Sequence, residues 1–224
     1  MSTPRRPYPG KRLFDLVVTA VLAVPVLALG AVCALAVRLT SPGPILFRQA
    51  RVGHDGESFT MLKFRTMRHD GKPNPLHPDK DRITTVGRIL RRTSLDELPQ
   101  LLNVARGEMS IVGPRPTLRY QVDRYDSRQL GRLAVRPGLT GLAQVQGRNA
   151  STWAERIELD LEYVERQSVK LDCQLLLRTV GALVSGSGVE GHPHDDPIAR
   201  PDEPVADEPV AEEPGAEAPI AEES

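Results

Sequence analysis

An apolar run near the N-terminus constrains this chain more than any other feature. Residues 16–37 are almost wholly apolar, and the exceptions are Thr19, Pro25 and Gly30. About 20 consecutive apolar residues are enough for a helix to cross the hydrocarbon core of a bilayer. A cleaved signal peptide has a shorter apolar core and a small-residue cleavage site, which residues 38–42 do not offer. The run therefore predicts a helix inserted in a membrane.

Basic residues flank this run on both sides, and basic flanks prefer the cytoplasmic face of a membrane. Pro25 removes a helix hydrogen bond and is expected to bend the helix. Two topologies stay open: a helix that enters, bends and returns with both ends in the cytoplasm, and a simple span. The flanking residues are Arg5, Arg6, Lys11 and Arg12 before the run, and Arg38, Arg48 and Arg51 after it.

Charge is segregated along the chain, although the formal net charge is zero. Residues 1–189 hold 28 basic and 17 acidic side chains, a surplus of 11 positive charges. A basic body suits anionic partners such as lipid headgroups or nucleotide phosphates, whereas an aromatic content of 4% disfavours base stacking with nucleic acid. The acidic end is rich in Pro, Ala and Glu and is predicted to be disordered.

Two strands are predicted after the apolar run, over residues 45–52 and 58–64, with an Asp55-Gly56 hairpin signal between them. Lys63 and Arg65 differ by two positions, so on a strand they would share one face. Two interpretations stay open for them: a cationic pair that binds phosphate, and a solvated strand edge.

Two adjacent carboxylates mark the centre of the chain. Ser94 followed by Glu97 is a capping-box pattern, which predicts that a helix begins at Ser94. Asp96 would then lie in the first turn, where free N–H groups and the helix dipole favour an ionised carboxylate. Such a carboxylate can act as a nucleophile or as a metal ligand. The plain alternative is an ordinary helix cap.

Arginines surround these carboxylates. Arg88, Arg91 and Arg92 come just before them, and Arg106 and Arg115 come just after, the latter between two prolines. Carboxylates for a divalent cation beside arginines for phosphate oxygens are typical of phosphoryl transfer.

The rest of the chain is predicted to be mostly helical. A loop is expected over residues 69–81, helices over residues 82–92 and 117–133, and a pair of helices over 153–184 that separate near Gln167-Ser168. Residues 136–149 form a glycine-bracketed segment whose backbone could approach a phosphate closely. The last helix carries an apolar stripe that serves either core packing or binding to the membrane interface. Cys33 and Cys173 suggest neither a disulfide framework nor a zinc site.

Taken together, these segments resemble the bacterial sugar transferases, the small monotopic polyprenyl-phosphate phosphoglycosyl transferases. The likeness covers about residues 11–184 and rests on several motifs in order. The motifs are Lys11-Arg12-Leu13-Phe14-Asp15, Ser41-Pro42-Gly43-Pro44, Lys63-Phe64-Arg65-Thr66-Met67, Ser94-Leu95-Asp96-Glu97-Leu98-Pro99-Gln100, Gly113-Pro114-Arg115-Pro116, Pro137-Gly138-Leu139-Thr140-Gly141 and Asp160-Leu161-Glu162-Tyr163-Val164.

The resemblance implies a chemistry and a topology. By resemblance, Asp96 attacks the β-phosphate of a UDP-sugar, expels UMP and forms an aspartyl-phosphosugar. Polyprenyl phosphate, with undecaprenyl phosphate the expected form, then takes the sugar phosphate. The resemblance also implies Mg²⁺ held at Asp96 and Glu97, and a re-entrant helix broken near Pro25, where Val24 replaces the serine that the family often has. Arg115 is assigned to the nucleotide-sugar diphosphate, and further phosphate-binding residues are expected to be Lys63, Arg65, Arg91 and Arg148.

The expected fold class is α+β, mostly helical around a small β element with no large sheet. Four parts are expected: a basic lead (1–10), a re-entrant membrane helix (11–39), a cytosolic catalytic domain with interfacial helices (40–188) and the acidic tail (189–224). Such a protein would lie on the cytoplasmic face of the bacterial inner membrane. Its expected partners are UDP-sugar, polyprenyl phosphate and membrane lipid, with downstream glycosyltransferases of exopolysaccharide or lipopolysaccharide assembly and no nucleic acid. Two alternatives remain: a non-catalytic membrane-anchored protein that binds anionic lipid, and an enzyme that transfers the sugar without its phosphate.

Overall fold

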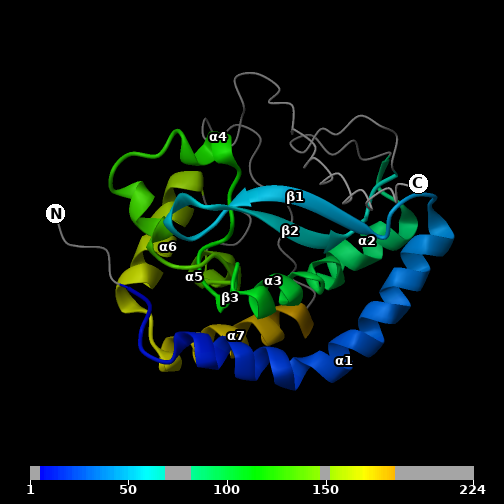
Figure 1. Ribbon diagram of the computed structural model, residues 1–224, viewed down its shortest axis with the longest axis horizontal. Helices are drawn as coiled ribbons and strands as arrows, with labels where there is room; N and C mark the ends of the chain where they lie inside the picture. The colour runs from blue at the N-terminus through cyan, green and yellow to red at the C-terminus, as the bar shows by residue number, and fades with distance from the viewer. Residues whose placement is uncertain (1–5, 69–81, 147–151, 185–224) are drawn as a thin grey trace, which may run out of the picture.

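The computed structural model describes residues 6–68, 82–146 and 152–184 (Figure 1). Three of the sequence predictions fall outside these residues: the phosphate contact of Arg148, the loop before residue 82 and the acidic tail. Within the described parts the fold is mostly helical, with two small two-stranded sheets and one long apolar helix at the N-terminal end. This agrees with the predicted fold class.

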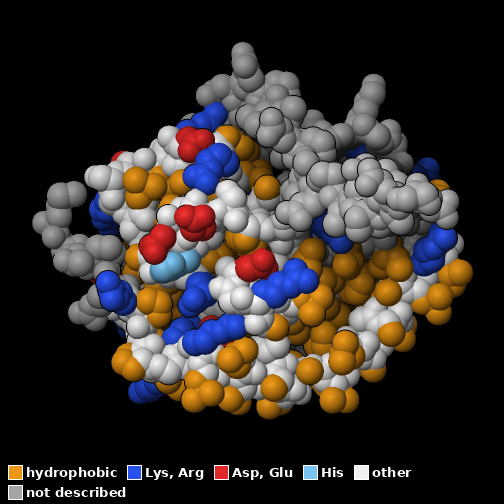
Figure 2. All heavy atoms as spheres, viewed as in Figure 1, with side chains coloured by type: hydrophobic (Ala, Val, Ile, Leu, Met, Phe, Trp, Pro, Cys, Tyr) orange, Lys and Arg blue, Asp and Glu red, His pale blue; other side chains and the backbone are white. Residues whose placement is uncertain are grey.

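Helix α1 (Lys11–Thr40) contains the predicted apolar run and extends beyond it at both ends. Thirty residues of helix are about 45 Å long. The helix is continuous through Pro25 and changes direction along its length (Figure 1). It is long and apolar enough to cross a membrane, and only 11% of its most apolar window is buried. Figure 2 shows apolar side chains gathered along the edge of the molecule that α1 forms.

The predicted hairpin is present. Strands β1 (Leu46–Val52) and β2 (Ser58–Phe64) pair antiparallel, with Leu46 opposite Phe64. The short helix η1 (His54–Gly56) connects them, and Asp55 and Gly56 adopt left-handed backbone angles there, with φ of 53° and 82°. Aspartate and glycine tolerate this conformation better than other residues, which explains why the Asp-Gly signal identified the turn correctly.

The glycine-bracketed segment has a structural use. Strands β3 (Ser110–Val112) and β4 (Gly138–Thr140) pair in parallel, and α5 (Leu142–Gln146) follows. A Cβ atom added to Gly138 would lie 2.1 Å from the backbone nitrogen of Gly113, and one added to Gly141 would lie 2.2 Å from its carbonyl oxygen. These glycines let two backbone segments approach each other, so close packing accounts for them without a phosphate.

The remaining helices surround these sheets. The two C-terminal helices break between residues 166 and 169, as predicted. The helix predicted from residue 82 begins later, because Thr84 caps it by accepting a hydrogen bond from the Gly87 N–H group. The elements are α2 (Thr85–Arg92), η3 (Leu95–Glu97), α3 (Gln100–Arg106), α4 (Arg119–Val122), η4 (Gln129–Ala134), α6 (Trp153–Arg166) and α7 (Val169–Val184).

The prediction of one helix over residues 117–133 is wrong. The segment folds as α4 and η4 with a break between them. At the break, the Asp126 Oδ1 atom accepts hydrogen bonds from the backbone N–H groups of Arg128 and Gln129, both at 2.8 Å. An aspartate side chain that takes these donors competes with the helix for them.

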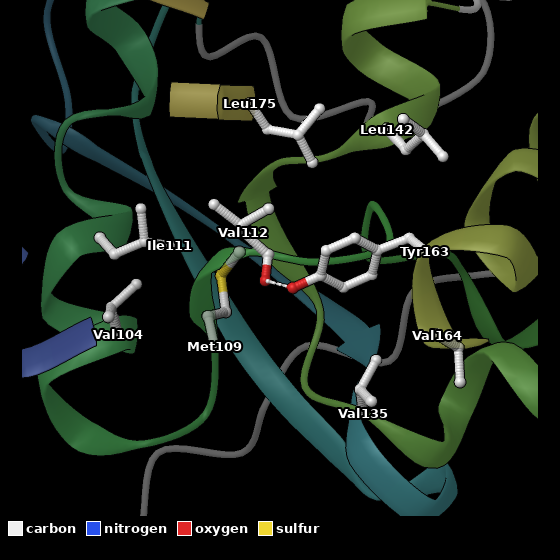
Figure 3. Close-up of a cluster of buried hydrophobic side chains, with 9 residues drawn as sticks. All are labelled: Val104, Met109, Ile111, Val112, Val135, Leu142, Tyr163, Val164 and Leu175. Atoms are coloured by element: carbon white, nitrogen blue, oxygen red, sulfur yellow. Dashed lines mark hydrogen bonds between the residues drawn. The ribbon is translucent and has the colours of Figure 1, made fainter. Parts of the chain in front are cut away.

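Three buried clusters hold the domain together. The largest joins β3 to α6 and α7, and in it the Tyr163 hydroxyl donates to the Val112 carbonyl (Figure 3). Leu175 of the apolar stripe on α7 is buried in this cluster, while Val180 is exposed, so part of that stripe packs in the core. A third cluster packs Cys33 and Val37 of α1 against β2 and α2. Cys33 and Cys173 are both free.

A buried polar cluster attaches the start of α1 to the domain. We name it the N-terminal anchor, and it consists of Lys11, Asp15, Tyr163 and Asp172. The Lys11 Nζ atom lies 2.6 Å from Asp172 Oδ2, and the Tyr163 hydroxyl lies 2.9 Å from Asp172 Oδ1, so its one proton is shared between this carboxylate and the Val112 carbonyl. Asp15 Oδ1 accepts hydrogen bonds from the Ser110 hydroxyl and the Ile111 N–H group of β3. The anchor therefore couples α1 to β3 and α7.

Candidate active site

The two adjacent carboxylates lie in a tight turn between α2 and α3. Ser94 adopts a left-handed conformation, with φ of 55°, and its side chain makes no capping hydrogen bond. The predicted helix start at Ser94 is therefore wrong. Pro99 explains the difference, because a proline four residues after Leu95 lacks the N–H group and its ring would clash with the Leu95 carbonyl. Helix α3 begins only at Gln100.

Glu97 is paired with two cations. Its Oε1 atom lies 2.8 Å from the Nζ atom of Lys63 and 2.9 Å from the Nη2 atom of Arg115. Burial opposes ionisation of this carboxyl, but the charges of Arg115 and Lys63 outweigh it and lower the pKa to about 2. Glu97 is therefore an ion that holds two cations in place.

Asp96 has the opposite character, although it is the next residue. It is 8% exposed, and its carboxylate has no hydrogen-bond or ion-pair partner among the described residues. Burial raises its pKa, and Glu97 adds to the rise, while Lys63, Arg91 and Arg115 counteract it. Burial therefore outweighs the stabilisation of the ionised form that a helix terminus was expected to give. A desolvated carboxylate with uncommitted oxygens is well suited to nucleophilic attack.

Lys63 and Arg91 complete the cationic wall around Asp96. Lys63 comes from β2, and burial lowers its pKa although Glu97 opposes the change. The Arg91 Nε atom donates to the Thr66 hydroxyl at 2.9 Å. A Cβ atom on Gly87 would lie 2.0 Å from the Thr66 carbonyl oxygen, so glycine allows α2 to pack directly on this backbone. That close packing determines where Arg91 lies.

Arg115 follows β3 and keeps part of its guanidinium free. Its side chain is 41% exposed, which leaves it accessible to a ligand. Its carbonyl accepts a hydrogen bond from the Nη2 atom of Arg132 at 3.0 Å, and the buried Arg132 also pairs with Asp160. Sequence reasoning missed Arg132, since it lies in a segment that reads as an ordinary polar helix. Asp160 was recognised only as part of a motif.

Arg65 is separate from this cluster. Its Nη2 atom donates to the Ser41 carbonyl at 2.7 Å, beside the end of α1. Lys63 instead pairs with Glu97, so the two cations that were predicted to act as one pair have different partners. The structure thus brings together Lys63, Arg91, Asp96, Glu97 and Arg115, and leaves Arg65 elsewhere.

Comparison with known proteins identifies the family to which these motifs belong. The model of the family described as "Bacterial sugar transferase" matches residues 7–186. The chain belongs to the bacterial sugar transferase family. The match contains every described residue of the carboxylate turn and its cations, and it begins just before the N-terminal anchor.

Individual relatives of this sugar transferase carry informative names. It is 43% identical over 186 residues to the "Uncharacterized sugar transferase EpsL" of Bacillus subtilis, covering 82% of this chain and 92% of that protein. It is 46% identical over 187 residues to a "UDP-glucose:undecaprenyl-phosphate glucose-1-phosphate transferase" of Caulobacter vibrioides, covering 78% and 70%. It is 39% identical over 196 residues to the "Exopolysaccharide production protein ExoY" of Sinorhizobium fredii, covering 80% and 87%.

The carboxylates of this sugar transferase are suited to a magnesium ion that is shared with substrate phosphates. The described residues contain no group of three or more His, Cys, Asp or Glu side chains that could hold a metal alone. Mg²⁺ is usually bound by one or two carboxylates together with substrate phosphates and water. Asp96 has uncommitted oxygens, and Glu97 uses only Oε1 for its two cations among the described residues. This donor set fits the predicted ion.

Proposed function

We propose that this protein is a phosphoglycosyl transferase that moves a sugar-1-phosphate from a UDP-sugar to undecaprenyl phosphate and releases UMP. The reaction would be the first membrane step in assembling an exopolysaccharide or another glycoconjugate. The observation that carries the proposal is the buried Asp96, which has no partner among the described residues and lies beside a Glu97 that holds Lys63 and Arg115. The named transferase of Caulobacter vibrioides supports the choice of donor and acceptor.

In the first step, an Asp96 carboxylate oxygen attacks the β-phosphorus of the UDP-sugar. A new O–P bond forms, the bond between the β-phosphorus and the bridging oxygen breaks, and UMP leaves with the bonding electrons. Arg115, whose side chain is partly exposed, is oriented by Glu97 to bind the diphosphate, and the charges of Lys63 and Arg91 act on Asp96. These cations counteract the repulsion between an anionic nucleophile and an anionic substrate.

In the second step, an oxygen of the lipid phosphate attacks the phosphorus of the aspartyl-phosphosugar. The aspartyl O–P bond breaks, Asp96 is regenerated as a carboxylate, and the product is a polyprenyl diphosphate sugar. Division into two steps lets UMP leave before the second anion arrives. Asp96 and Glu97 would hold Mg²⁺, which supplies positive charge to the phosphate oxygens when bound.

The packing of α1 supports a re-entrant, monotopic topology on the cytoplasmic face. At its start, Lys11 and Asp15 bond to α7 and β3, and near its end Cys33 and Val37 pack on β2 and α2. A straight helix of about 45 Å that crossed a bilayer would separate its ends by more than the hydrocarbon thickness of about 30 Å. One compact domain touches both ends, so the helix is inferred to enter and leave through the same face.

A donor-only incubation tests the proposed reaction. The purified protein, reconstituted in phospholipid nanodiscs, is mixed with Mg²⁺ and each of a panel of UDP-sugars without any polyprenyl phosphate. We expect a burst of UMP close to one equivalent per protein, and a sugar-phosphate adduct on the peptide that contains Asp96 by mass spectrometry. Release of UDP would favour transfer of the sugar alone. No release of UMP or UDP with any donor would favour a lipid-binding protein.

A further inference from the structure

Arg65 is a buried guanidinium whose charge nothing in the described chain balances. It is 6% exposed, and among the described residues its guanidinium donates one hydrogen bond, from Nη2 to the Ser41 carbonyl. Its Nε and Nη1 atoms are buried without a hydrogen-bond partner, and no carboxylate among the described residues pairs with it. An unpaired buried charge destabilises a fold, so such a group is expected to have a ligand.

The surroundings of Arg65 resemble an incomplete anion site. Ser41 is 5% exposed, and its hydroxyl is also buried without a partner. Arg38, in the last turn of α1, is exposed, and its charge adds to the effect of burial in lowering the pKa of Arg65. Two arginines and a hydroxyl are the donors that typically bind phosphate oxygens. The negative end of the α1 dipole offsets only about half of one charge, which leaves the site positive.

A simpler role for Arg65 is to cap the C-terminal end of α1. A capping arginine donates to the last carbonyls of its helix, and here one donor reaches the carbonyl of the residue that follows α1. A capping role does not explain why the Nε and Nη1 atoms of Arg65 and the Ser41 hydroxyl are buried without a hydrogen-bond partner among the described residues. It also predicts that removing the charge lowers the melting temperature and leaves substrate binding unchanged.

The position of the site indicates the source of the phosphate. Leu39 is 75% exposed at the end of the apolar helix and follows directly after Arg38. An exposed leucine beside an exposed arginine is typical of the boundary between lipid chains and headgroups. Lys63 lies two residues before Arg65, a distance of about 7 Å along an extended chain. Lys63 pairs with Glu97, so two residues along the chain separate Arg65 from a member of the carboxylate cluster.

We propose that Arg65, Ser41 and Arg38 bind the phosphate group of the acceptor, polyprenyl phosphate, at the headgroup level beside the carboxylate turn. This inference rests on the proposed function and assigns the two substrates to different residues. Arg115, Lys63 and Arg91 serve the nucleotide sugar, and the site around Arg65 serves the lipid. A lipid phosphate held there would be retained near Asp96 while UMP leaves.

Separate measurement of the two half-reactions tests this division. The variants are Arg65→Met, Arg65→Lys and Ser41→Ala, with Arg48→Gln as the matched control, since Arg48 is an exposed arginine on β1. We expect Arg65→Met to raise the KM for polyprenyl phosphate by at least about tenfold, the effect of losing hydrogen bonds to a charged group. Its donor-only UMP burst and its KM for the UDP-sugar should match the wild type. The KM for polyprenyl phosphate of Arg65→Lys and of Ser41→Ala should lie between those of the wild type and Arg65→Met. The KM of Arg48→Gln should equal that of the wild type.

Two further measurements separate acceptor binding from bulk headgroup binding and from helix capping. Flotation with vesicles of neutral or anionic phospholipid shows whether Arg65 recognises bulk headgroups. A loss of binding to anionic vesicles with an unchanged KM for polyprenyl phosphate would overturn the assignment to the acceptor. A lower melting temperature in Arg65→Met with an unchanged KM would show a helix cap only. A wild-type protein that gives no UMP burst would refute the proposed function itself, a result separate from any effect of Arg65.

Discussion

Two ionic clusters in this protein are built around similar charged groups and have opposite character. The N-terminal anchor and the carboxylate turn each contain one lysine and two carboxylates: Lys11 with Asp15 and Asp172, and Lys63 with Asp96 and Glu97. In the anchor, both carboxylates accept hydrogen bonds from buried donors. In the turn, Glu97 is paired and Asp96 has no partner in the described structure.

The difference shows how structural and reactive ionic clusters can be told apart. A cluster that stabilises a fold satisfies each charge, because an unpaired buried ion destabilises the protein. A cluster that performs chemistry leaves one group unsatisfied for the substrate and accepts a loss of stability there. Substitutions in the anchor should therefore change stability and not chemistry, and substitution of Asp96 should do the reverse.

The largest expected effect is the loss of activity in Asp96→Asn. An amide cannot form the covalent adduct, so we expect UMP release and turnover to fall on the order of 10³-fold or more. Because the ionised carboxylate is buried and unpaired, the melting temperature at neutral pH should not fall, and its rise would sharpen the contrast with the anchor. Asp123→Asn is the control, since Asp123 is an exposed aspartate after α4. Normal turnover in Asp96→Asn would refute its role as the nucleophile.

The second effect is the loss of stability in Asp172→Asn. The change leaves Lys11 buried without its closest partner, which we expect to cost about 3 kcal/mol of unfolding free energy. Urea titration in detergent, followed by the fluorescence of the buried and single tryptophan Trp153, measures this loss. Lys170→Gln, an exposed change on α7, is the control. The double variant Lys11→Met, Asp172→Asn should recover part of the loss, and strictly additive losses would show that the two charges are not coupled.

The third effect is a pH dependence that differs between the two neighbouring carboxyls. The pKa of Glu97 falls from the ordinary 4.5 to about 2 on folding, so its contribution is present above pH 4.5 and is lost as the pH falls towards 2. Glu97→Gln should therefore cost up to about 3 kcal/mol at pH 7, and this cost should vanish in strong acid. Equilibrium unfolding from pH 2 to 7 measures it.

In the same pH series, substitution of Asp96 should change the free energy of unfolding in the opposite direction from substitution of Glu97. Its pKa is raised on folding, so the protonated form is favoured in the folded state and ionisation destabilises it. Any gain in stability of Asp96→Asn should be present at neutral pH and disappear below the ordinary value of 3.8. Parallel pH profiles for the two variants would contradict the assignment of different roles to these adjacent residues.

The sequence predicted those features that local chemistry determines. The Asp-Gly turn required left-handed angles that few residues adopt, and the break near residues 167–168 interrupts helical periodicity. The Ser94 cap failed because Pro99 decides where a helix can begin, and the helix after residue 117 failed because the Asp126 side chain takes its N–H donors. Pro99 and Asp126 were both visible in the sequence, but the capping-box pattern and the helical pattern suggested longer helices.

The sequence identified most residues of the candidate site but not the contacts between them. Asp96, Glu97 and Arg115 could be selected because carboxylates and arginines together suit phosphate chemistry. The pairing of Glu97 with Lys63 joins residues 34 positions apart, and Arg132 supports Arg115 through its carbonyl from an unremarkable segment. No local pattern specifies such contacts, since they depend on how β2, β3 and η4 pack. For the same reason, Arg65 could not be separated from Lys63 without the structure.

The smallest expected effect concerns Arg12 and the flanking charges of α1. Arg12 donates to the carbonyls of Val104 and Ala105 at 2.5 and 2.8 Å, where α3 ends. Arginine at a helix C-terminus satisfies free carbonyls and interacts favourably with the dipole, so Arg12→Met should cost about 1 kcal/mol. Arg106→Met, which removes an exposed cation from the same turn of α3, should cost only about 0.3 kcal/mol.

The same pair of variants asks whether Arg12 belongs with the anchor or with the topology signals of membrane helices. If its role is to cap α3, Arg12→Met lowers stability and leaves both ends of α1 equally accessible to a membrane-impermeant thiol reagent at cysteines placed beside them. If its charge instead determines orientation, accessibility of one end is lost while the unfolding free energy stays unchanged. The contacts with α3 favour the first outcome, because a guanidinium already bonded to two carbonyls has fewer donors for lipid headgroups.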